Sequence, residues 1–401
     1  MRDRLQQHIS KISLGAASAA LMVAVVLGLG AVTTQRAHAQ TFTDLYNFTG
    51  GHDGGTPYAG LVRDAKGNLY GTTYWNGSYG WGTVFKVDTN GTETVLYSFC
   101  PGGIPCTDGG NPAAGLIRDA HGSLYGTTQS GGSADRGTVF KVDTNGTETV
   151  LYNFAGGASD GCDPDQGLVR DKAGNFYGTG ECGAFGKGVV FELSLQGQET
   201  VLHNFAGGSS DGASPVLGSL LTDKAGNLYG TTEFGGTSGQ GVVYKLGKNG
   251  FKVLHSFAGG TTDGCFPFGS VAMDKNGNLY STTYQCGVSG KGVVWKLSRK
   301  GKLTVLHSFA GAPNDGDTPE SGVKMDAKGN LYGNTTVGGA TGYGAVYRLD
   351  SKRKLTLLHS FTGSDGQVPI GDLILDKKGN LYGTAEGGGT GSNGTVWSLK
   401  P

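Results

Sequence analysis

Two carboxylates, Asp165 and Glu320, are the residues of this sequence best placed for acid–base chemistry. Each directly follows a proline at the same position of a repeat that recurs along the chain. Two carboxylates can act as general acid and general base when their surroundings separate their pKa values. We expect both at the mouth of a central channel, but nearly opposite each other and too far apart to share a proton transfer. The sequence holds neither an HExxH zinc motif nor a CxxC redox motif, so catalysis is the weaker hypothesis.

Aromatic side chains offer a second kind of chemistry, because their flat apolar faces and hydrogen-bonding edges suit sugar rings or a protein partner. They are concentrated in residues 74–81, where the other repeats carry mostly Gly, Ser and Thr. The alternative is that Trp75 and Trp81 pack beneath a long loop. The candidate ligand-binding residues are Tyr74, Trp75, Tyr79, Trp81, Phe268 and Tyr284.

The six cysteines fall at positions that the repeat relates to one another. Two lie two residues after a repeated aspartate, two directly follow a predicted second strand, and two share the longest loop between repeats. Disulfides of this kind imply an oxidising compartment. Metal binding by the thiolates is the alternative. The bridges that we predict are Cys162–Cys182, Cys265–Cys286 and Cys100–Cys106.

Two other residue types that bind metals recur about once per repeat. One aspartate per repeat does not supply the six to eight oxygens of a calcium site. We therefore interpret it as a turn residue that caps backbone N–H groups, with calcium as the alternative. Four histidines share one position in predicted outermost strands and cannot converge on one zinc ion, so we predict no metal and no cofactor. The aspartates are Asp53, Asp108, Asp160, Asp211, Asp263, Asp315 and Asp365, and the histidines are His203, His255, His307 and His359.

The unit that positions these residues is a repeat of about 51 residues, present seven times and starting near each of those aspartates. A tyrosine recurs with the same spacing, and its first occurrence is Tyr70. Each repeat has the pattern of four short strands, which in the first repeat are residues 60–64, 68–73, 82–87 and 94–99. Tight hairpins join the first strand to the second and the third to the fourth, with glycine available for positive φ. Four-stranded repeats of this length predict an all-β fold, a seven-bladed β-propeller.

The two ends of residues 40–401 complement each other. Residues 43–48 have the sequence of a fourth strand without the first three, and residues 394–399 have that of a third strand without a fourth. We predict that the N-terminal strand completes the seventh sheet. This arrangement closes the ring and leaves no blade with an unpaired edge.

Several motifs occur together in the repeats and in one order: Phe-x-Gly-x-x-Asp-Gly, Gly-Leu-Val-Arg-Asp, Gly-Asn-Leu-Tyr-Gly-Thr-Thr and Gly-Thr-Val-Phe-Lys-Val. In these motifs residues 41–401 resemble the GloVer-type tandem repeat family of bacterial exported proteins with varied surface anchors. More distantly, the strand order is similar to that of NHL-type propellers. The resemblance implies an exported or envelope protein. Many members carry a C-terminal sorting tail, but this sequence has none before Lys400-Pro401. We therefore expect free secretion.

Residues 1–39 have the features of a secretory signal, because basic residues precede an apolar run over residues 12–32 and Ala37-His38-Ala39 offers a cleavage site. An uncleaved membrane anchor is the alternative, since the run is long enough to span. Cleavage near Ala39 leaves 28 basic and 31 acidic residues. This balance gives no electrostatic case for nucleic acid or for an anionic membrane, and no second apolar segment could span one.

We therefore expect a secreted, extracellular or periplasmic protein that works as a binding module. Its partner would be an extracellular glycan or an envelope protein, held on the face that carries the cysteine-bridged loops. One alternative is a propeller hydrolase or lyase with its site at Asp165 and Glu320. Another is a structural protein of the envelope or matrix. The ligand and the oligomeric state do not follow from the sequence.

Overall fold

The computed structural model describes residues 40–215 and 218–400, and they belong to one compact unit that begins at Gln40. The predicted signal sequence, Val216 and Leu217 lie outside the described residues. All regular secondary structure in the described part is β-strand, and no helix there is long and apolar enough to cross a membrane. The prediction of an all-β fold is confirmed.

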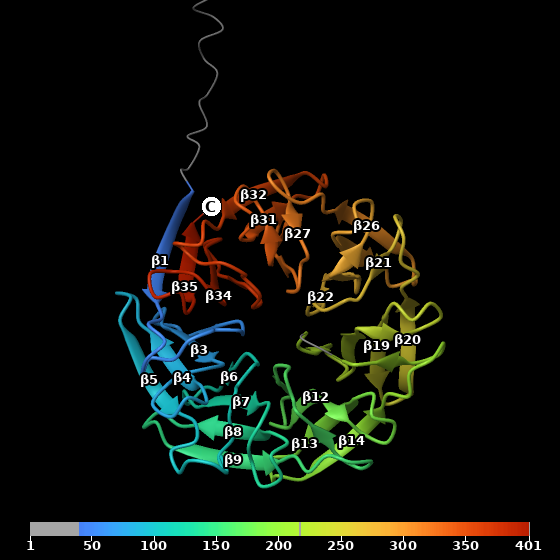
Figure 1. Cartoon of the computed structure of the whole chain (residues 1–401). Coiled ribbons are helices and arrows are strands. Elements are labelled where there is room, and N and C mark those ends of the chain that lie inside the picture. Colours follow the sequence, from blue (N-terminus) through green and yellow to red (C-terminus); the bar gives the residue numbers. More distant parts are fainter. Residues whose placement is uncertain (1–39, 216–217, 401) are drawn as a thin grey trace, which may run out of the picture. The chain divides into compact units, whose positions relative to one another are not determined.

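Seven antiparallel sheets are arranged as blades around a central axis, each with its first strand innermost (Figure 1). The first strands are β2 (Val62–Arg63), β6 (Ile117–Arg118), β11 (Val169–Arg170), β16 (Leu221–Thr222), β22 (Ala272–Met273), β28 (Lys324–Met325) and β33 (Ile374–Leu375). The second strands are β3 (Leu69–Thr73), β7 (Leu124–Thr128), β12 (Phe176–Cys182), β17 (Leu228–Thr232), β23 (Leu279–Thr283), β29 (Leu331–Thr335) and β34 (Leu381–Ala385). The third strands are β4 (Thr83–Val87), β8 (Thr138–Val142), β13 (Val189–Leu193), β19 (Val242–Gly247), β25 (Val293–Leu297), β31 (Ala345–Leu349) and β35 (Thr395–Lys400). The fourth strands are β5 (Glu93–Ser98), β9 (Glu148–Asn153), β14 (Glu199–Asn204), β20 (Gly250–Ser256), β26 (Leu303–Ser308), β32 (Leu355–Ser360) and β1 (Thr41–Asn47).

The first strands are shorter than the sequence predicted. Residues 60 and 61 of the first repeat do not pair with β3, because this part of the chain lies against the backbone of the neighbouring blade. A Cβ atom at Gly60 would stand 2.8 Å from the carbonyl oxygen of Asp372. Glycine is therefore required where adjacent blades meet at the channel, and only two residues remain for the innermost strand.

The seventh sheet closes the ring. β1 pairs antiparallel with β35, from Thr41 opposite Lys400 to Asn47 opposite Thr395, and the sheet order is β1–β35–β34–β33. Figure 1 shows the blue N-terminal strand beside the red C-terminal one. The N-terminal strand thus completes the last blade, as the sequence predicted.

The antiparallel register gives the ring two different faces. In blade one, Leu69 pairs with Arg63 and with Val87, and Val87 pairs with Glu93. The hairpins at residues 64–68 and 88–92 therefore leave the sheet at the same edge. We call the side with these hairpins and their equivalents the hairpin face. The opposite side, the mouth face, carries the loops after the second strands and the loops that enter each blade.

Apolar layers between adjacent blades form the core. Between blades seven and one the layer includes Phe48, Leu69, Phe85 and Val396, all buried. Each blade leaves room for the aromatic ring of its third strand by having a small residue opposite it. A Cβ atom at Gly71 would stand 2.7 Å from Cζ of Phe85, so the glycine of the Leu-Tyr-Gly motif is a packing requirement.

The repeated aspartate fastens each outermost strand to the loop that follows it. Asp211 accepts a hydrogen bond of 2.8 Å from the backbone N–H of Ala206, and its carboxylate lies 3.1 Å from Nε2 of His203. In blade one, Asp108 binds the Tyr97 hydroxyl at 2.7 Å and the Cys100 N–H at 2.9 Å in the same way. These aspartates are turn residues, as we interpreted them, and the histidines are held one per blade at the outer rim.

Candidate functional site

The mouth face is reinforced by short ladders and by disulfides. In four blades the loop entering the blade pairs with the loop after its second strand. The pairs are β10 (Gly161–Cys162) with β12, β15 (Gly212–Ala213) with β18 (Phe234–Gly235), β21 (Gly264–Cys265) with β24 (Gln285–Cys286), and β27 (Gly316–Asp317) with β30 (Val337–Gly338). The disulfides join Cys162 to Cys182, Cys265 to Cys286 and Cys100 to Cys106. The predicted pairing is confirmed, and its reason is that paired loops bring equivalent cysteines together.

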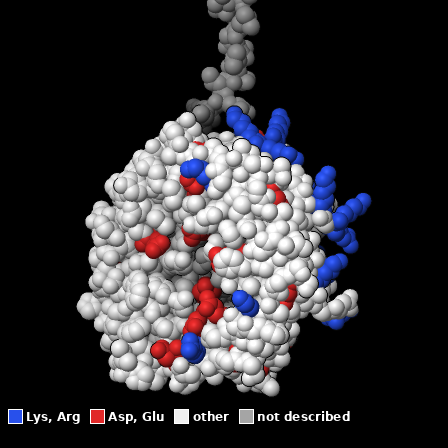
Figure 2. Space-filling view, turned by 45° about the vertical axis from the view of Figure 1, so that its right-hand side comes forward, with Lys and Arg blue, Asp and Glu red and all other residues white. Residues whose placement is uncertain are grey.

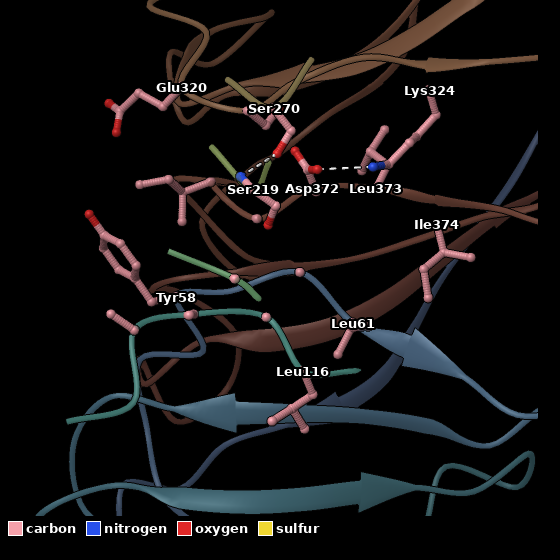
Figure 3. A pocket seen from close by; sticks show the side chains of 18 of the residues that line it. Tyr58, Leu61, Leu116, Ser219, Ser270, Glu320, Lys324, Asp372, Leu373 and Ile374 are labelled. Atoms are coloured by element: carbon pink, nitrogen blue, oxygen red, sulfur yellow. Dashed lines mark hydrogen bonds and ion pairs between the residues drawn. The ribbon is translucent and has the colours of Figure 1, made fainter. Parts of the chain in front are cut away.

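A cavity of about 520 Å³ occupies the centre of the ring and opens at the mouth face. The loops that enter the blades surround it, and in five blades the residue after the repeated proline lines it: Tyr58, Ala113, Asp165, Glu320 and Ile370. Figure 3 shows Tyr58 and Glu320 at one end, while Leu61, Leu116 and Ile374 lie at the other. The outer end is therefore polar, whereas the inner end combines apolar side chains with the Lys324 and Asp372 pair.

The structure brings both predicted carboxylates to this one cavity. Burial, aided by the charge of Glu181, raises the pKa of Asp165 to about 7. Burial also raises the pKa of Glu320 to about 7, and the charge of Glu386 adds to the effect while a hydrogen bond of 3.3 Å from the Thr336 hydroxyl opposes it. Each carboxyl group can therefore gain or lose a proton near neutral pH, which is what general acid–base work requires.

Tyr58 is electrostatically coupled to the carboxylates of three other blades. Burial raises the pKa of its hydroxyl above the ordinary value, and the charges of Glu320, Glu386 and Asp165 raise it further. A tyrosine in this setting stays protonated and remains a hydrogen-bond donor. The outer end of the cavity thus combines one O–H donor with several acceptors.

No cation neutralises these carboxylates. The one lysine that lines the cavity, Lys324, lies 2.9 Å from Asp372 deeper in the channel. Burial opposes ionisation of Asp372, but the Lys324 ammonium and the Gly322 N–H hold its pKa below the usual range. Within residues 40–215 and 218–400, neither Asp165 nor Glu320 forms an ion pair with Lys or Arg. Figure 2 shows acidic side chains gathered around the central hollow of the ring.

The predicted aromatic residues separate into three groups. Tyr74 and Trp75 line a second cavity of about 290 Å³, which shares Tyr58 and Asp165 with the first and is therefore adjacent to it. Phe268 and Tyr284 pack edge to face at 5.2 Å, and the charge of Glu320 acts on Tyr284. The structure thus brings these four aromatic residues towards the acidic mouth.

The other two aromatic predictions lie elsewhere. Tyr79 is 50% exposed and lines neither cavity. Trp81 packs against the apolar layer between blades one and two, as the alternative interpretation held. Trp75, in contrast, is 47% exposed. Its indole meets the Tyr74 ring edge to face at 4.8 Å, which fixes its orientation beside the cavity.

Sequence reasoning missed a second set of mouth residues. The position four residues after the repeated tyrosine directly follows the core of each second strand, and it carries Glu181, Glu233 and Glu386 in blades three, four and seven. Glu386 lines the second cavity, and burial raises the pKa of Glu233 and of Glu386. The repeat frame that singled out Asp165 and Glu320 would have found these glutamates, had it been applied to this position.

Among the described residues, one group of potential metal ligands lies close enough together to share an ion, Cys162, Asp163 and Cys182. Because its two sulfur atoms are joined in a disulfide, it is not a thiolate site. The carboxylates of Asp165, Glu320 and Glu386 do not form such a group.

Comparison with known proteins gives a family and a fold. The model of the Gloeobacter/Verrucomicrobia repeat matches residues 24–182 and 179–397. No curated protein is detectably similar in sequence. Among solved structures, the extracellular domain of a hybrid two-component system from B. thetaiotaomicron is similar with a TM-score of 0.55 at 11% identity. The match covers 89% of this chain and 39% of that one, so this chain spans well under half of that protein's length.

Two lactonase structures are less similar. A protein from Bacteroides uniformis named as a 6-phosphogluconolactonase matches at 16% identity and a TM-score of 0.49, over 81% of this chain and 88% of that one. A gluconolactonase from Xanthomonas campestris matches at 19% identity and a TM-score of 0.42, over 70% and 82% of the two chains. Sequence identities this low support a shared fold alone. The two lactonase matches therefore do not indicate which chemistry this chain performs.

Proposed function

The chain belongs to the Gloeobacter/Verrucomicrobia repeat family, and we propose that it is an exported binding module that recognises a glycan at the mouth of its central cavity. The observation that carries the proposal is that Tyr74 and Trp75 lie beside carboxylates that no cation of the described residues neutralises, around two adjacent cavities. Aromatic faces stack on sugar rings, and carboxylates accept hydrogen bonds from hydroxyl groups. The three disulfides support export, because such bridges persist in oxidising compartments.

The charge of the mouth narrows the class of sugar. A uronic acid or a sulfated sugar would bring its anion next to Asp165, Glu320 and Glu386, where the local electrostatics disfavour it. Neutral sugars and amino sugars meet no such penalty, and a protonated amine gains from the carboxylates. We therefore propose neutral or amino-containing glycans as the ligand class.

Calorimetry with a panel of neutral, amino-containing and acidic oligosaccharides tests this function in residues 40–401. Trp75→Ala should weaken binding at least about tenfold, which corresponds to about 1.4 kcal/mol. Phe185→Ala is the matched control, because Phe185 is 60% exposed on the same face and lines neither cavity. Binding that prefers acidic sugars, or that the control weakens as much as Trp75→Ala does, would contradict the proposal.

A second candidate function is glycan cleavage by hydrolysis or elimination. The observation that favours it is that Asp165 and Glu320, in one cavity, both have pKa values of about 7. Such groups can serve as acid and base near neutrality. If the protein cleaves the glycan that it binds, Asp165→Asn and Glu320→Gln should each abolish the release of new chain ends while retaining binding. Binding without any release of chain ends would leave the recognition function alone.

A third possibility from the sequence, a structural role in the envelope or matrix, predicts neither binding nor turnover in these assays. Such a result would remove both proposals for the mouth.

A further inference from the structure

The hairpin face of blades four to seven is strongly basic. The hairpins that join the third and fourth strands of blades five and six carry Arg299, Lys300 and Lys302, and Lys352, Arg353 and Lys354. All six side chains are exposed. Figure 2 shows long Lys and Arg side chains projecting from the rim, away from the acidic hollow. The ring therefore has an acidic mouth on one face and cations on the other.

The charges of two of these cations act on neighbouring groups, Arg299 on Tyr229 and Lys352 on Asp350. The carboxylate of Asp350 also accepts hydrogen bonds from the backbone N–H groups of Lys352 and Lys354, each at 2.9 Å. In the described part of the chain, no ion pair involves any of the six cations. Nothing in the local structure explains why so many like charges are collected on one side of the ring.

The basic hairpins of blades four to seven, which we call the basic region, lie at two different distances from the axis of the ring. The hairpins between third and fourth strands lie at the outer rim, whereas those between first and second strands lie nearer the axis. The inner hairpins of these blades are basic as well, with Lys275 in blade five and Lys377 and Lys378 in blade seven. Because the register places all of these hairpins at the same edge of their sheets, the cations form two concentric arcs on one side of the ring.

We propose that this basic region binds the surface of an anionic lipid bilayer. Two arcs of exposed cations on one face match a flat anionic surface, because each side chain can reach a headgroup at the same time. A single polyanionic chain could follow only one arc. Neither of the two cavities described above includes a residue of this region, and its exposed residues are mainly cations, so we expect its recognition to be electrostatic. Docking in this way leaves the mouth face directed away from the bilayer and open to its ligand, although the inference does not depend on what that ligand is.

The strength of such binding follows from the number of cations. Each Lys or Arg next to an anionic membrane surface raises the partition coefficient about fivefold, and salt screens the effect within about 10 Å at 0.1 M ionic strength. Removing three cations should therefore weaken binding about a hundredfold. Raising the salt concentration should release the protein.

The test is co-sedimentation of residues 40–401, one compact unit, with vesicles. Phosphatidylcholine vesicles that contain phosphatidylglycerol are compared with vesicles of phosphatidylcholine alone. The variant replaces Arg299, Lys300 and Lys302 by glutamine. The control replaces Arg136, Lys187 and Lys291, three basic residues in the loops of the mouth face, by glutamine. Both variants change the net charge equally, and circular dichroism confirms that both are folded.

We expect the protein to bind the anionic vesicles alone and to be released at high salt. The triple variant of Arg299, Lys300 and Lys302 should bind about a hundredfold more weakly, whereas the control should bind almost as well as the unchanged protein. Equal binding to both kinds of vesicle, or equal losses in the two variants, would overturn the proposal. Failure to bind anionic vesicles, together with binding to a soluble polyuronate, would also overturn it and would assign the face to an acidic polysaccharide.

Discussion

Replacing Phe48 by alanine tests whether the ring is closed in solution. Phe48 directly follows β1 and is fully buried, as are the six residues at the same position of the other blades: Phe99, Phe154, Phe205, Phe257, Phe309 and Phe361. Its ring meets Phe85 of blade one edge to face at 5.1 Å, and its N–H donates a 3.0 Å hydrogen bond to the carbonyl oxygen of Gly394. In a closed ring, the interface between blades seven and one is as well packed as any other.

The size of the effect follows from this burial. Truncating a fully buried phenylalanine to alanine costs about 3–5 kcal/mol, because the transfer free energy of the ring is lost and a cavity remains. Phe154→Ala is the matched control, since Phe154 is equally buried and meets Phe191 at 5.2 Å in a similar edge-to-face contact. We expect the two losses to agree within about 2 kcal/mol, the spread seen for one type of core truncation at different sites.

Urea unfolding followed by circular dichroism measures both losses, with the slope of the free energy against denaturant checked for constancy between variants. If Phe154→Ala costs about 3–5 kcal/mol while Phe48→Ala costs almost nothing, the N-terminal strand is frayed and the closure argument is wrong. A synthetic peptide of residues 40–51 offers a second readout. Added to a chain that lacks residues 41–49, it should restore the melting temperature in a concentration-dependent way, as a ligand of the native state does.

Three further predictions concern stability. Replacing Cys265 and Cys286 together by serine should lower the free energy of unfolding by about 3 kcal/mol in non-reducing buffer, the chain-entropy value for a loop of this size, and an unchanged melting temperature would refute it. Burial and the charge of Asp108 raise the pKa of Glu148 to about 8. The stability associated with its protonated carboxyl group is therefore fully present below the pKa of the unfolded chain and is lost as the pH rises through about 8. Because the group is partly exposed, we discount the shift and expect Glu148→Gln to be more stable by about 1–2 kcal/mol above that pH and equal at pH 4, measured by urea unfolding across the pH range. Gly178→Ala would place a Cβ atom 2.6 Å from Cζ of Phe191 and should cost about 1–3 kcal/mol in the same assay, whereas a neutral result would show that the ring can move aside.

The fold could be predicted from the sequence because its signals are local and occur seven times. Each hairpin between a first and a second strand has an Asp-x-x-Gly turn. In the first of them, Gly67 has a positive φ and its N–H donates to the carbonyl oxygen of Asp64. The disulfides followed from the same frame. The short first strands did not, because their length is set by the approach of the neighbouring blade at Gly60, a contact between repeats that no single repeat reveals.

One inter-blade contact was open to prediction and was missed. A residue at or next to the start of the fourth strand of one blade acts on the Tyr or His in the fourth strand of the preceding blade. Where the preceding blade has tyrosine at this position, the residue that acts on it is a glutamate, as with Tyr97 and Glu148. Where the preceding blade has histidine, the partner is apolar, and His203 stacks on Phe251 with ring centroids 3.9 Å apart. The two positions lie about 50 residues apart, so the complementarity is visible only when successive repeats are aligned with an offset of one blade.

The charge of the two faces was hidden for a different reason. The sequence holds 32 basic and 32 acidic residues, and this balance was taken to exclude an anionic partner. A sum over the chain ignores the alternation that an antiparallel meander imposes, in which successive loops leave the sheet at opposite edges. In blade six, Glu320 borders the cavity at one edge, and the hairpin with Lys352 lies at the other. Counting charge separately for odd and even loops would have separated an acidic mouth from a basic face.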